Sequence, residues 1–358
     1  MTETTSAATS WQAFLAQQGA VFASDDSLHG AEASGFGAVA GAAVPEHFVA
    51  PLTDLGLISL SGDDAVSFLH NQITNDVEKL DLGSARLAGY CTPKGRLLAT
   101  FLLWKDSQQI MLQLPRPLQT TIQKRLQMFV LRAKVKLVDQ SEQRVALGLA
   151  GSKATEVLQQ WFPVMPAHAY AKLDNEHGTL IRLADSRQAP RYQWITTVEQ
   201  AIVAWPLLTQ KLTPAATQVW RLSDIYAGVP SITKPTQEQF VPQMINFELI
   251  GGVNFKKGCY PGQEIVARSQ YLGKLKRRSV LALVDGIDVT AGNEVFSSED
   301  PGQPCGMVVN AEVANDGNSA CLVEIKLAAA DNGSIHVGSV AGPALKLLTL
   351  PYELAEPQ

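Results

Sequence analysis

One short stretch, KKGCYPGQEIVAR at residues 256–268, concentrates the side chains that could do chemistry. It combines the thiol of Cys259 with the carboxylate of Glu264 and three cations. The Pro-Gly pair at 261–262 fits the centre of a type II turn, because proline presets the first φ and glycine accepts the positive second one. Residues 263–269 are then predicted to form a short helix, with Glu264 in the first turn, where a negative charge suits the helix dipole.

Cys259 is the candidate reactive residue of this stretch. The prediction places it just before a helix N-terminus and beside Lys256 and Lys257. Both features favour the thiolate form, which is the nucleophile and the metal ligand. The alternative is a small hydrophobic side chain in a tight turn, because unpaired cysteines are usually just buried. The residue types alone leave both interpretations open.

Other clusters carry weaker signals. Cys91, Cys305 and Cys321 form no C-x-x-C pair with each other or with Cys259, so no redox pair or disulfide framework is predicted. His70 lies near Asp76 in the chain, but no H-x-x-x-H pair exists, and we predict no metal site.

A run of four cations, Lys274, Lys276, Arg277 and Arg278, is either an anion site or a solvated connector. Trp220 could stack on a flat heterocycle, although a lone tryptophan is more often part of a core.

The composition limits the function classes. The chain has 358 residues, of which 46% are hydrophobic and 18% charged, as expected for two or three compact globular units. The net charge of −5 argues against a dedicated nucleic-acid binder, so no stable direct tRNA binding is expected.

The N-terminus has no cationic segment typical of a signal peptide, and residues 35–44 are too short to span a bilayer. With unpaired cysteines, this predicts a cytoplasmic protein with no membrane partner.

The elements that must position these residues fall into four parts. Residues 1–45 are predicted to be a flexible lead-in with one small helix around Trp11. Residues 46–140 form a first α+β unit, whose helix at 117–130 has a core stripe that ends at Phe129. Residues 141–272 form a second such unit that includes the 256–268 stretch. Residues 273–358 contain six short strand-like runs, which predict a small antiparallel barrel.

The stretch around Cys259 resembles the signature of the YgfZ family of folate-binding proteins, which are relatives of the glycine-cleavage T-protein. The resemblance covers roughly residues 46–358. It includes NQITND at 71–76, the Lys-Gly turn at 94–95, Gly251-Gly252, and LPY at 350–352. The signature positions in this chain are Lys257, Gly258, Cys259, Tyr260, Gly262, Gln263 and Glu264, followed by Arg268.

The resemblance implies an α+β ring of three domains, two ferredoxin-like and one β-barrel, around a site for tetrahydrofolate or another reduced folate. It also implies a role in keeping iron–sulfur client enzymes active, including one that modifies tRNA. Two family folate positions carry over, one to Trp220 and one to Leu55. Some relatives have tryptophan at the second position. Leucine can pack on a pterin but cannot stack in the same way.

One departure from the relatives concerns catalysis. T-proteins carry a pair of aspartates after the turn at 94–95, and the corresponding residues here are Ala99 and Thr100. Neither can act as a general base. We therefore expect a folate-binding maintenance factor rather than an aminomethyltransferase, which is the alternative. Cys259 is expected to be its working thiol, partly accessible and at the edge of the folate cavity.

Overall fold

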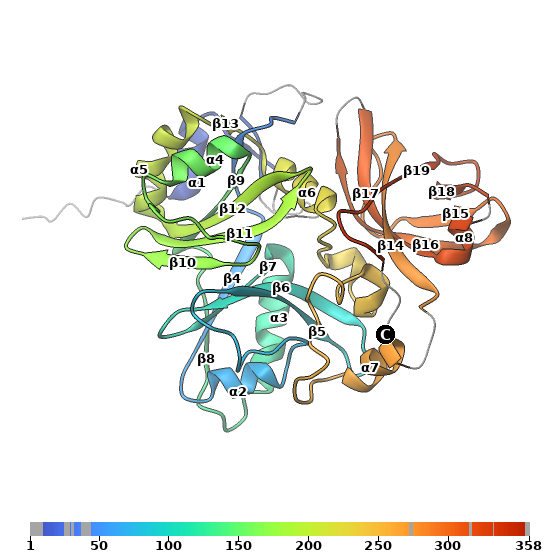
Figure 1. Ribbon diagram of the computed structural model, residues 1–358, viewed down its shortest axis with the longest axis horizontal. Coiled ribbons are helices and arrows are strands. Elements are labelled where there is room, and N and C mark those ends of the chain that lie inside the picture. Colours follow the sequence, from blue (N-terminus) through green and yellow to red (C-terminus); the bar gives the residue numbers. More distant parts are fainter. Residues whose placement is uncertain are drawn as a thin grey trace, which may run out of the picture.

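The computed structural model describes residues 10–24, 29, 32–36, 44–271, 275–314, 317–331 and 333–354. Three lobes surround a common centre, and each is built on one large β-sheet (Figure 1). The predicted α+β class and the ring of three domains are both confirmed.

The first lobe is an antiparallel sheet covered by two helices. The strands lie in the order β5 (Ala85–Cys91), β6 (Leu97–Lys105), β7 (Ile110–Pro115), β4 (Leu55–Ser61) and β8 (Lys136–Asp139). The helices are α2 (Ala65–His70) and α3 (Arg116–Met128). On α3, Leu118, Ile122 and Leu126 are buried as expected. The expectation for Phe129 is wrong: its side chain is 47% exposed, because the helix ends at Met128 and the chain turns away from the core.

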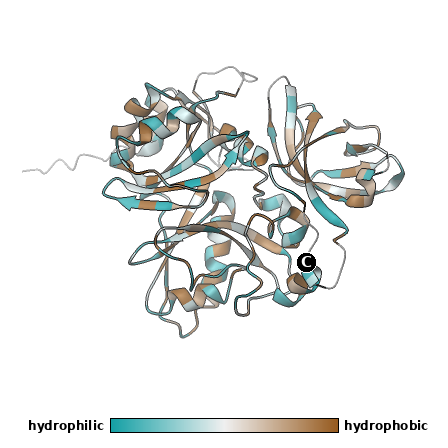
Figure 2. Cartoon of the chain, in the orientation of Figure 1, coloured by the Kyte–Doolittle hydropathy of each residue, from teal (hydrophilic) through white to brown (hydrophobic). Residues whose placement is uncertain are grey.

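The second lobe has a six-stranded sheet. Its strands are, in order, β10 (Lys172–Asn175), β11 (Gly178–Ser186), β12 (Ala189–Thr197), β9 (Arg144–Ala150), β3 (Phe48–Pro51) and β13 (Thr213–Pro214). Strand β3 precedes the whole first lobe in the chain, yet it pairs with β9 here. The helices α4 (Ser152–Leu158) and α5 (Val198–Thr209) carry hydrophobic residues that pack in the core of this lobe (Figure 2).

Part of the lead-in belongs to the second lobe. The expected small helix is α1 (Trp11–Gln17), and the Trp11 ring meets Trp205 of α5 edge to face at 5.7 Å. Strands β1 (Val21–Phe22) and β2 (Ala33–Gly35) pair with each other. Of the lead-in that was expected to be flexible, residues 1–9, 25–28, 30–31 and 37–43 lie outside the described residues.

The third lobe is the predicted antiparallel barrel, present as a curled six-stranded sheet (Figure 1). Each of the six expected runs is a strand. They lie in the order β18 (Ile335–Val337), β15 (Glu294–Ser297), β16 (Asp300–Val313), β17 (Asn318–Lys326), β14 (Arg277–Asp285) and β19 (Leu345–Leu348). A short helix, α8 (Leu327–Asp331), follows β17.

Helix α6 (Thr217–Tyr226) lies where the three lobes meet (Figure 1). It packs against β3 of the second lobe and against β16 and β17 of the third. The chain then passes through two short 3-10 turns, η1 (Lys234–Thr236) and η2 (Pro242–Ile245), before it reaches α7 (Gln263–Tyr271). Helix α6 and the signature stretch are therefore joined by a segment that lies along the centre of the ring.

Candidate functional site

The signature turn has the predicted geometry. The backbone N–H of Gln263 donates to the Tyr260 carbonyl at 3.1 Å, and Gly262 has a φ of 80°, as a type II turn requires. The turn packs on the hairpin turn between β5 and β6, where a Cβ on Gly262 would lie 2.3 Å from the Thr92 carbonyl oxygen. Glycine is therefore needed at 262 for both its φ and the close approach of the two turns.

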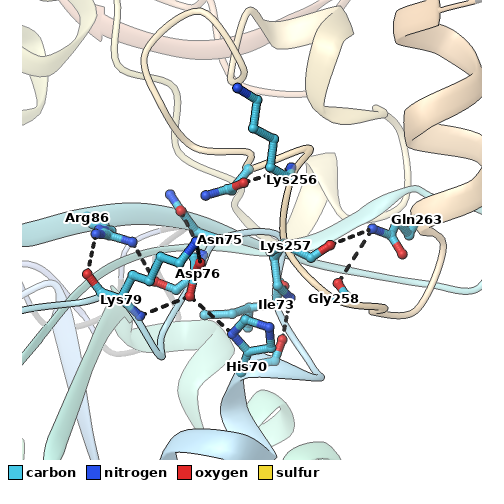
Figure 3. A network of polar contacts seen from close by, with 11 residues as sticks. His70, Ile73, Asn75, Asp76, Lys79, Arg86, Lys256, Lys257, Gly258 and Gln263 are labelled. Atoms are coloured by element: carbon cyan, nitrogen blue, oxygen red, sulfur yellow. Dashed lines mark hydrogen bonds and ion pairs between the residues drawn. The ribbon is translucent and has the colours of Figure 1, made fainter.

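Lys257 extends from the signature into the first lobe. Its side chain is 7% exposed, and Nζ donates to the carbonyl of His70 and, at 2.8 Å, to that of Ile73 (Figure 3). The ammonium also lies 4.9 Å from the centre of the buried Tyr260 ring. Burial lowers the pKa of Lys257 to about 8, against the opposing attraction of nearby acidic groups, first among them Asp76. Lys256, in contrast, is exposed and points away (Figure 3).

Cys259 is the one exposed thiol among the four cysteines of the chain. Burial raises the pKa of Cys91 and of Cys321 to about 12 and also raises that of Cys305. The backbone next to the thiol is bound by a signature side chain: Gln263 Nε2 donates to the carbonyl of Gly258 at 3.5 Å. Glu264 and Arg268 are exposed on α7. The expected accessibility of Cys259 is thus confirmed.

The NQITND stretch holds the segment that leads into the signature. The Thr74 hydroxyl donates to the Gly252 carbonyl at 2.6 Å and accepts from the Gly89 N–H at 2.7 Å. The Asn75 amide donates to the carbonyls of Gly251, at 2.7 Å, and Leu87, at 2.6 Å. We call this region, residues 70–79 with residues 251–263, the signature junction. It attaches the signature to the first lobe, although the signature follows the second lobe in the chain.

Trp220 and Leu55 line the same spaces inside the molecule. Both line a cavity of about 70 Å³ and an adjoining cavity of about 100 Å³. Leu55 also lines a groove of about 910 Å³ between the first two lobes. The Trp220 indole is only 3% exposed, and it packs closely on Gly148, where a Cβ would lie 2.4 Å from the ring. The guanidinium of Arg191 lies 5.0 Å from the ring centre.

The residues that line these two central cavities include none from 256–268. The expectation that Cys259 lies at the edge of the cavity is therefore wrong for the cavities that Trp220 and Leu55 share. Within the described part of the chain, the thiol and the two carried-over folate positions belong to different regions of the molecule.

A buried charge cluster beside Trp220 was not predicted from the sequence. Arg221 Nη1 donates to Asp54 at 2.9 Å and to Glu32, while its Nε donates to Glu312. His29 lies 3.6 Å from Glu312. The sequence offered no signal, because these partners come from the lead-in, the first lobe and the barrel. We call these five residues the Arg221 cluster.

The Arg221 cluster has more carboxyl groups than cations. Burial raises the pKa of Asp54 to about 6 and that of Glu312 to about 7, although the guanidinium of Arg221 opposes both shifts. Burial and then the same guanidinium lower the pKa of His29 to about 3. Among the described residues, Asp54 Oδ1 has no hydrogen-bond partner. The cavity wall therefore offers an acceptor to an N–H or O–H group of a ligand.

Ala99 and Thr100 lie on β6 in the first lobe and are buried. The Thr100 side chain lines the cavity of about 100 Å³, and its hydroxyl accepts from the Ile232 N–H at 3.1 Å. A methyl and a hydroxyl group thus stand on the strand where the T-protein pattern has carboxylates.

Two members of the cation run, Arg277 and Arg278, lie on β14 and form ion pairs, whereas Lys276 is exposed. Arg277 bonds both carboxylate oxygens of Glu324 at 2.8 and 2.9 Å, and Arg278 bonds Glu248. Lys274 lies outside the described residues. Both side chains are engaged within the protein, which argues against an anion site. Arg278 is only 3% exposed, so the expectation of a solvated connector is wrong for it. In the part of the chain that the structure describes, no helix is long and apolar enough to cross a membrane.

Comparison with known proteins agrees with this architecture. Residues 46–179 match the GCVT N-terminal domain family. The chain is similar in structure to the glycine cleavage system aminomethyltransferase T from Bartonella henselae, with a TM-score of 0.76. That match covers 97% of this chain and 98% of the other at 16% identity, so it shows the shared fold.

The sequence relatives are more specific. The tRNA-modifying protein YgfZ of Colwellia psychrerythraea is 32% identical over 322 residues, which are 87% of this chain and 95% of the relative. The protein of the same name from Yersinia pseudotuberculosis is 30% identical over 311 residues, which are 85% of this chain and 92% of the relative. The chain therefore belongs to the YgfZ family of tRNA-modifying proteins.

Proposed function

We propose that this protein binds a reduced folate, such as tetrahydrofolate, and supports the assembly or repair of iron–sulfur enzymes and thereby tRNA modification. The relatives' name supports the last part, since they are called tRNA-modifying proteins. The observation that carries the folate proposal is that Leu55 and Trp220, far apart in the chain, line the same two cavities. A site that two lobes build together is where ligands usually bind.

The size of the cavities decides how a folate would lie. The two inner cavities, of about 70 and 100 Å³, are smaller than the roughly 300–1,000 Å³ of typical ligand pockets. The adjoining groove of about 910 Å³ is large enough, and Leu55 lines all three spaces. We expect the pterin ring to enter the inner space beside Trp220 and the rest of the folate to follow the groove.

The chemistry of the inner wall suits a pterin. Such a ring presents amino and ring N–H donors, and Asp54 Oδ1 is an acceptor without a partner among the described residues. The Trp220 indole supplies an apolar aromatic contact. These groups would bind and orient the ring, while the apolar side chains of Ile225 and Val229 exclude water from it.

An aminomethyltransferase is the second candidate, because the fold matches that of the T-protein. Ala99 and Thr100 argue against it, since neither side chain can take a proton from a substrate amine at neutral pH. An assay of folate-dependent ammonia release from an aminomethylated carrier protein distinguishes the two functions. We expect no release at T-protein rates.

Folate binding is tested by thermal unfolding with and without tetrahydrofolate. A ligand present at a hundred times its Kd stabilises the folded state by about 2.7 kcal/mol, so a clear rise in Tm is expected. Retention of tRNA in a gel at physiological salt is the parallel measurement, and we expect none. Stabilisation by tRNA but not by tetrahydrofolate would contradict the proposal.

The role in iron–sulfur maintenance needs a cellular measurement. We propose Cys259 as the working thiol, because it is the exposed cysteine of the signature. The activity of an iron–sulfur tRNA-modifying enzyme is compared in cells without this protein and in cells that express the wild type or Cys259→Ser. We expect the wild type to restore activity and the serine variant to fail. Full restoration by Cys259→Ser would remove the thiol from the function.

A further inference from the structure

Three potential metal ligands meet under the signature. A nitrogen of His70 and carboxylate oxygens of Asp76 and Glu78 all lie within 4.8 Å of one another. His70 is 6% exposed and Asp76 is 4% exposed, whereas Glu78 is exposed. Figure 3 shows the His70 ring and the Asp76 carboxylate facing each other. No metal site was predicted here from the sequence, because the spacing matches no common ligand motif.

The buried contact inside this group lacks the geometry of a hydrogen bond. His70 Nδ1 lies 3.3 Å from Asp76 Oδ1, yet Nδ1 has no hydrogen-bond partner among the described residues. A buried polar atom without a partner is rare and calls for an explanation. Two ligands that are each about 2.0–2.1 Å from a tetrahedral ion lie about 3.3 Å apart, which is the spacing found here.

The backbone around the group is held in place. The Lys79 N–H donates to Asp76 Oδ1 at 3.0 Å, and Arg86 donates to the carbonyls of Asp76 and Lys79, each at 2.6 Å. The carbonyl of His70 is bound by Lys257 Nζ. These contacts fix the segments that carry the ligands, as the surroundings of metal sites commonly do.

We propose that His70, Asp76 and Glu78 bind a divalent first-row transition-metal ion, such as Zn²⁺ or Co²⁺. An imidazole nitrogen with two carboxylates suits these ions, whereas Mg²⁺ and Ca²⁺ prefer oxygen ligands alone. Three protein ligands leave a position open for water or for a group from a partner. The ammonium groups of Lys79 and Lys257 offset part of the negative charge, so the site is expected to bind the ion reversibly.

The proposed metal site lies directly beside the signature backbone. A Cβ on Gly258 would lie 3.3 Å from His70 Nε2, so the signature backbone passes directly over the imidazole. Cys259 is the next residue. His70, Asp76 and Glu78 do not line the two central cavities, so metal binding here does not depend on folate binding there.

The test uses the full chain without an affinity tag. Co²⁺ is added, and binding is followed by visible absorption and by calorimetry. His70→Gln and Glu78→Gln remove one ligand each, and binding should weaken at least about tenfold. The matched controls are His168→Gln and Glu156→Gln, which alter exposed residues elsewhere on the surface and should bind as the wild type does. A large excess of Mg²⁺ should not displace the ion.

The outcomes either support the metal site or overturn it. One Co²⁺ per chain, with affinity lost in His70→Gln and Glu78→Gln and kept in both controls, supports the site. Absence of binding, equal loss in the controls, or displacement by Mg²⁺ would overturn it. Unfolding curves of each variant show that it is folded, and Glu78→Gln is informative even if His70→Gln is unstable, because Glu78 is exposed. Cys259→Ser should leave the affinity unchanged.

Discussion

The buried side chains of Lys257, Thr74 and Asn75 at the signature junction and those of the Arg221 cluster are all polar, but they satisfy their polar groups in opposite ways. At the junction, Lys257, Thr74 and Asn75 each donate to backbone carbonyls. In the cluster, three carboxyl groups share one guanidinium, Asp54 Oδ1 has no partner among the described residues, and empty space adjoins them. A satisfied network fixes a shape, whereas an unsatisfied one beside a cavity is suited to a ligand.

The largest effect on stability is expected at Lys257, whose ammonium donates to two buried carbonyls of the junction. Lys257→Met leaves the buried carbonyls of His70 and Ile73 without their donor, so the free energy of unfolding should fall by about 3 kcal/mol or more. Urea denaturation measures it. Lys256→Met is the matched control, because Lys256 is exposed, and its effect should stay within about 0.5 kcal/mol. Similar values for the two variants would show that the junction is not held by Lys257.

The next prediction concerns Trp220, which lines the cavities beside the Arg221 cluster. Trp220→Ala should weaken tetrahydrofolate binding by roughly ten- to hundredfold, on the scale of about 1–3 kcal/mol for a heterocycle on an aromatic side chain. Calorimetry on the folded variant measures it. Trp161→Ala is the control: Trp161 is a buried tryptophan in the core of the second lobe, so it should cost stability without changing folate affinity. Unchanged affinity in Trp220→Ala would remove Trp220 from the site.

A third prediction uses the raised pKa of Glu312. The pKa is about 7 in the folded protein and 4.5 in its ordinary state, so the folded state binds the proton more tightly. The resulting stabilisation is fully present below pH 4.5 and is lost as the pH rises through 7. The stability of wild type relative to Glu312→Gln should therefore fall by about 1–3 kcal/mol between pH 5 and pH 8. A difference that is independent of pH would show that Glu312 is already ionised at pH 5.

The smallest effect on stability is expected at Cys259. Because the side chain is exposed, Cys259→Ser should change the free energy of unfolding by less than about 0.5 kcal/mol. Alkylation followed by mass spectrometry should modify Cys259 first, since Cys91, Cys305 and Cys321 are buried and burial raises the pKa of each. Faster modification of Cys91 would mean that the first lobe opens more readily than the junction exposes its thiol.

The parts that the sequence predicted are those with local signals. A Pro-Gly pair followed by a helical pattern located the turn and α7, and alternating runs located the barrel strands. The Arg221 cluster could not be predicted, because Glu32 and Glu312 are 189 and 91 residues away from Arg221 in the chain. Glu78 gave no signal for a different reason: it lies close to His70 in the chain, but the spacing matches no common ligand motif, and the structure was needed to show that their side chains meet. Leu55 and Trp220 were found through resemblance, whereas their shared cavity needed the structure.

Strand β3 has a consequence for how the molecule is made. It leaves the ribosome before the first lobe, but its partner β9 emerges after that lobe is complete. The first lobe is thus an insertion within the second, and the second sheet closes only when the intervening chain has been synthesised. Cutting the chain at the end of β8 would separate β3 from β9 and give two fragments that each lack a strand partner. A fragment that starts at β4 and ends at β8 follows the spatial boundary instead.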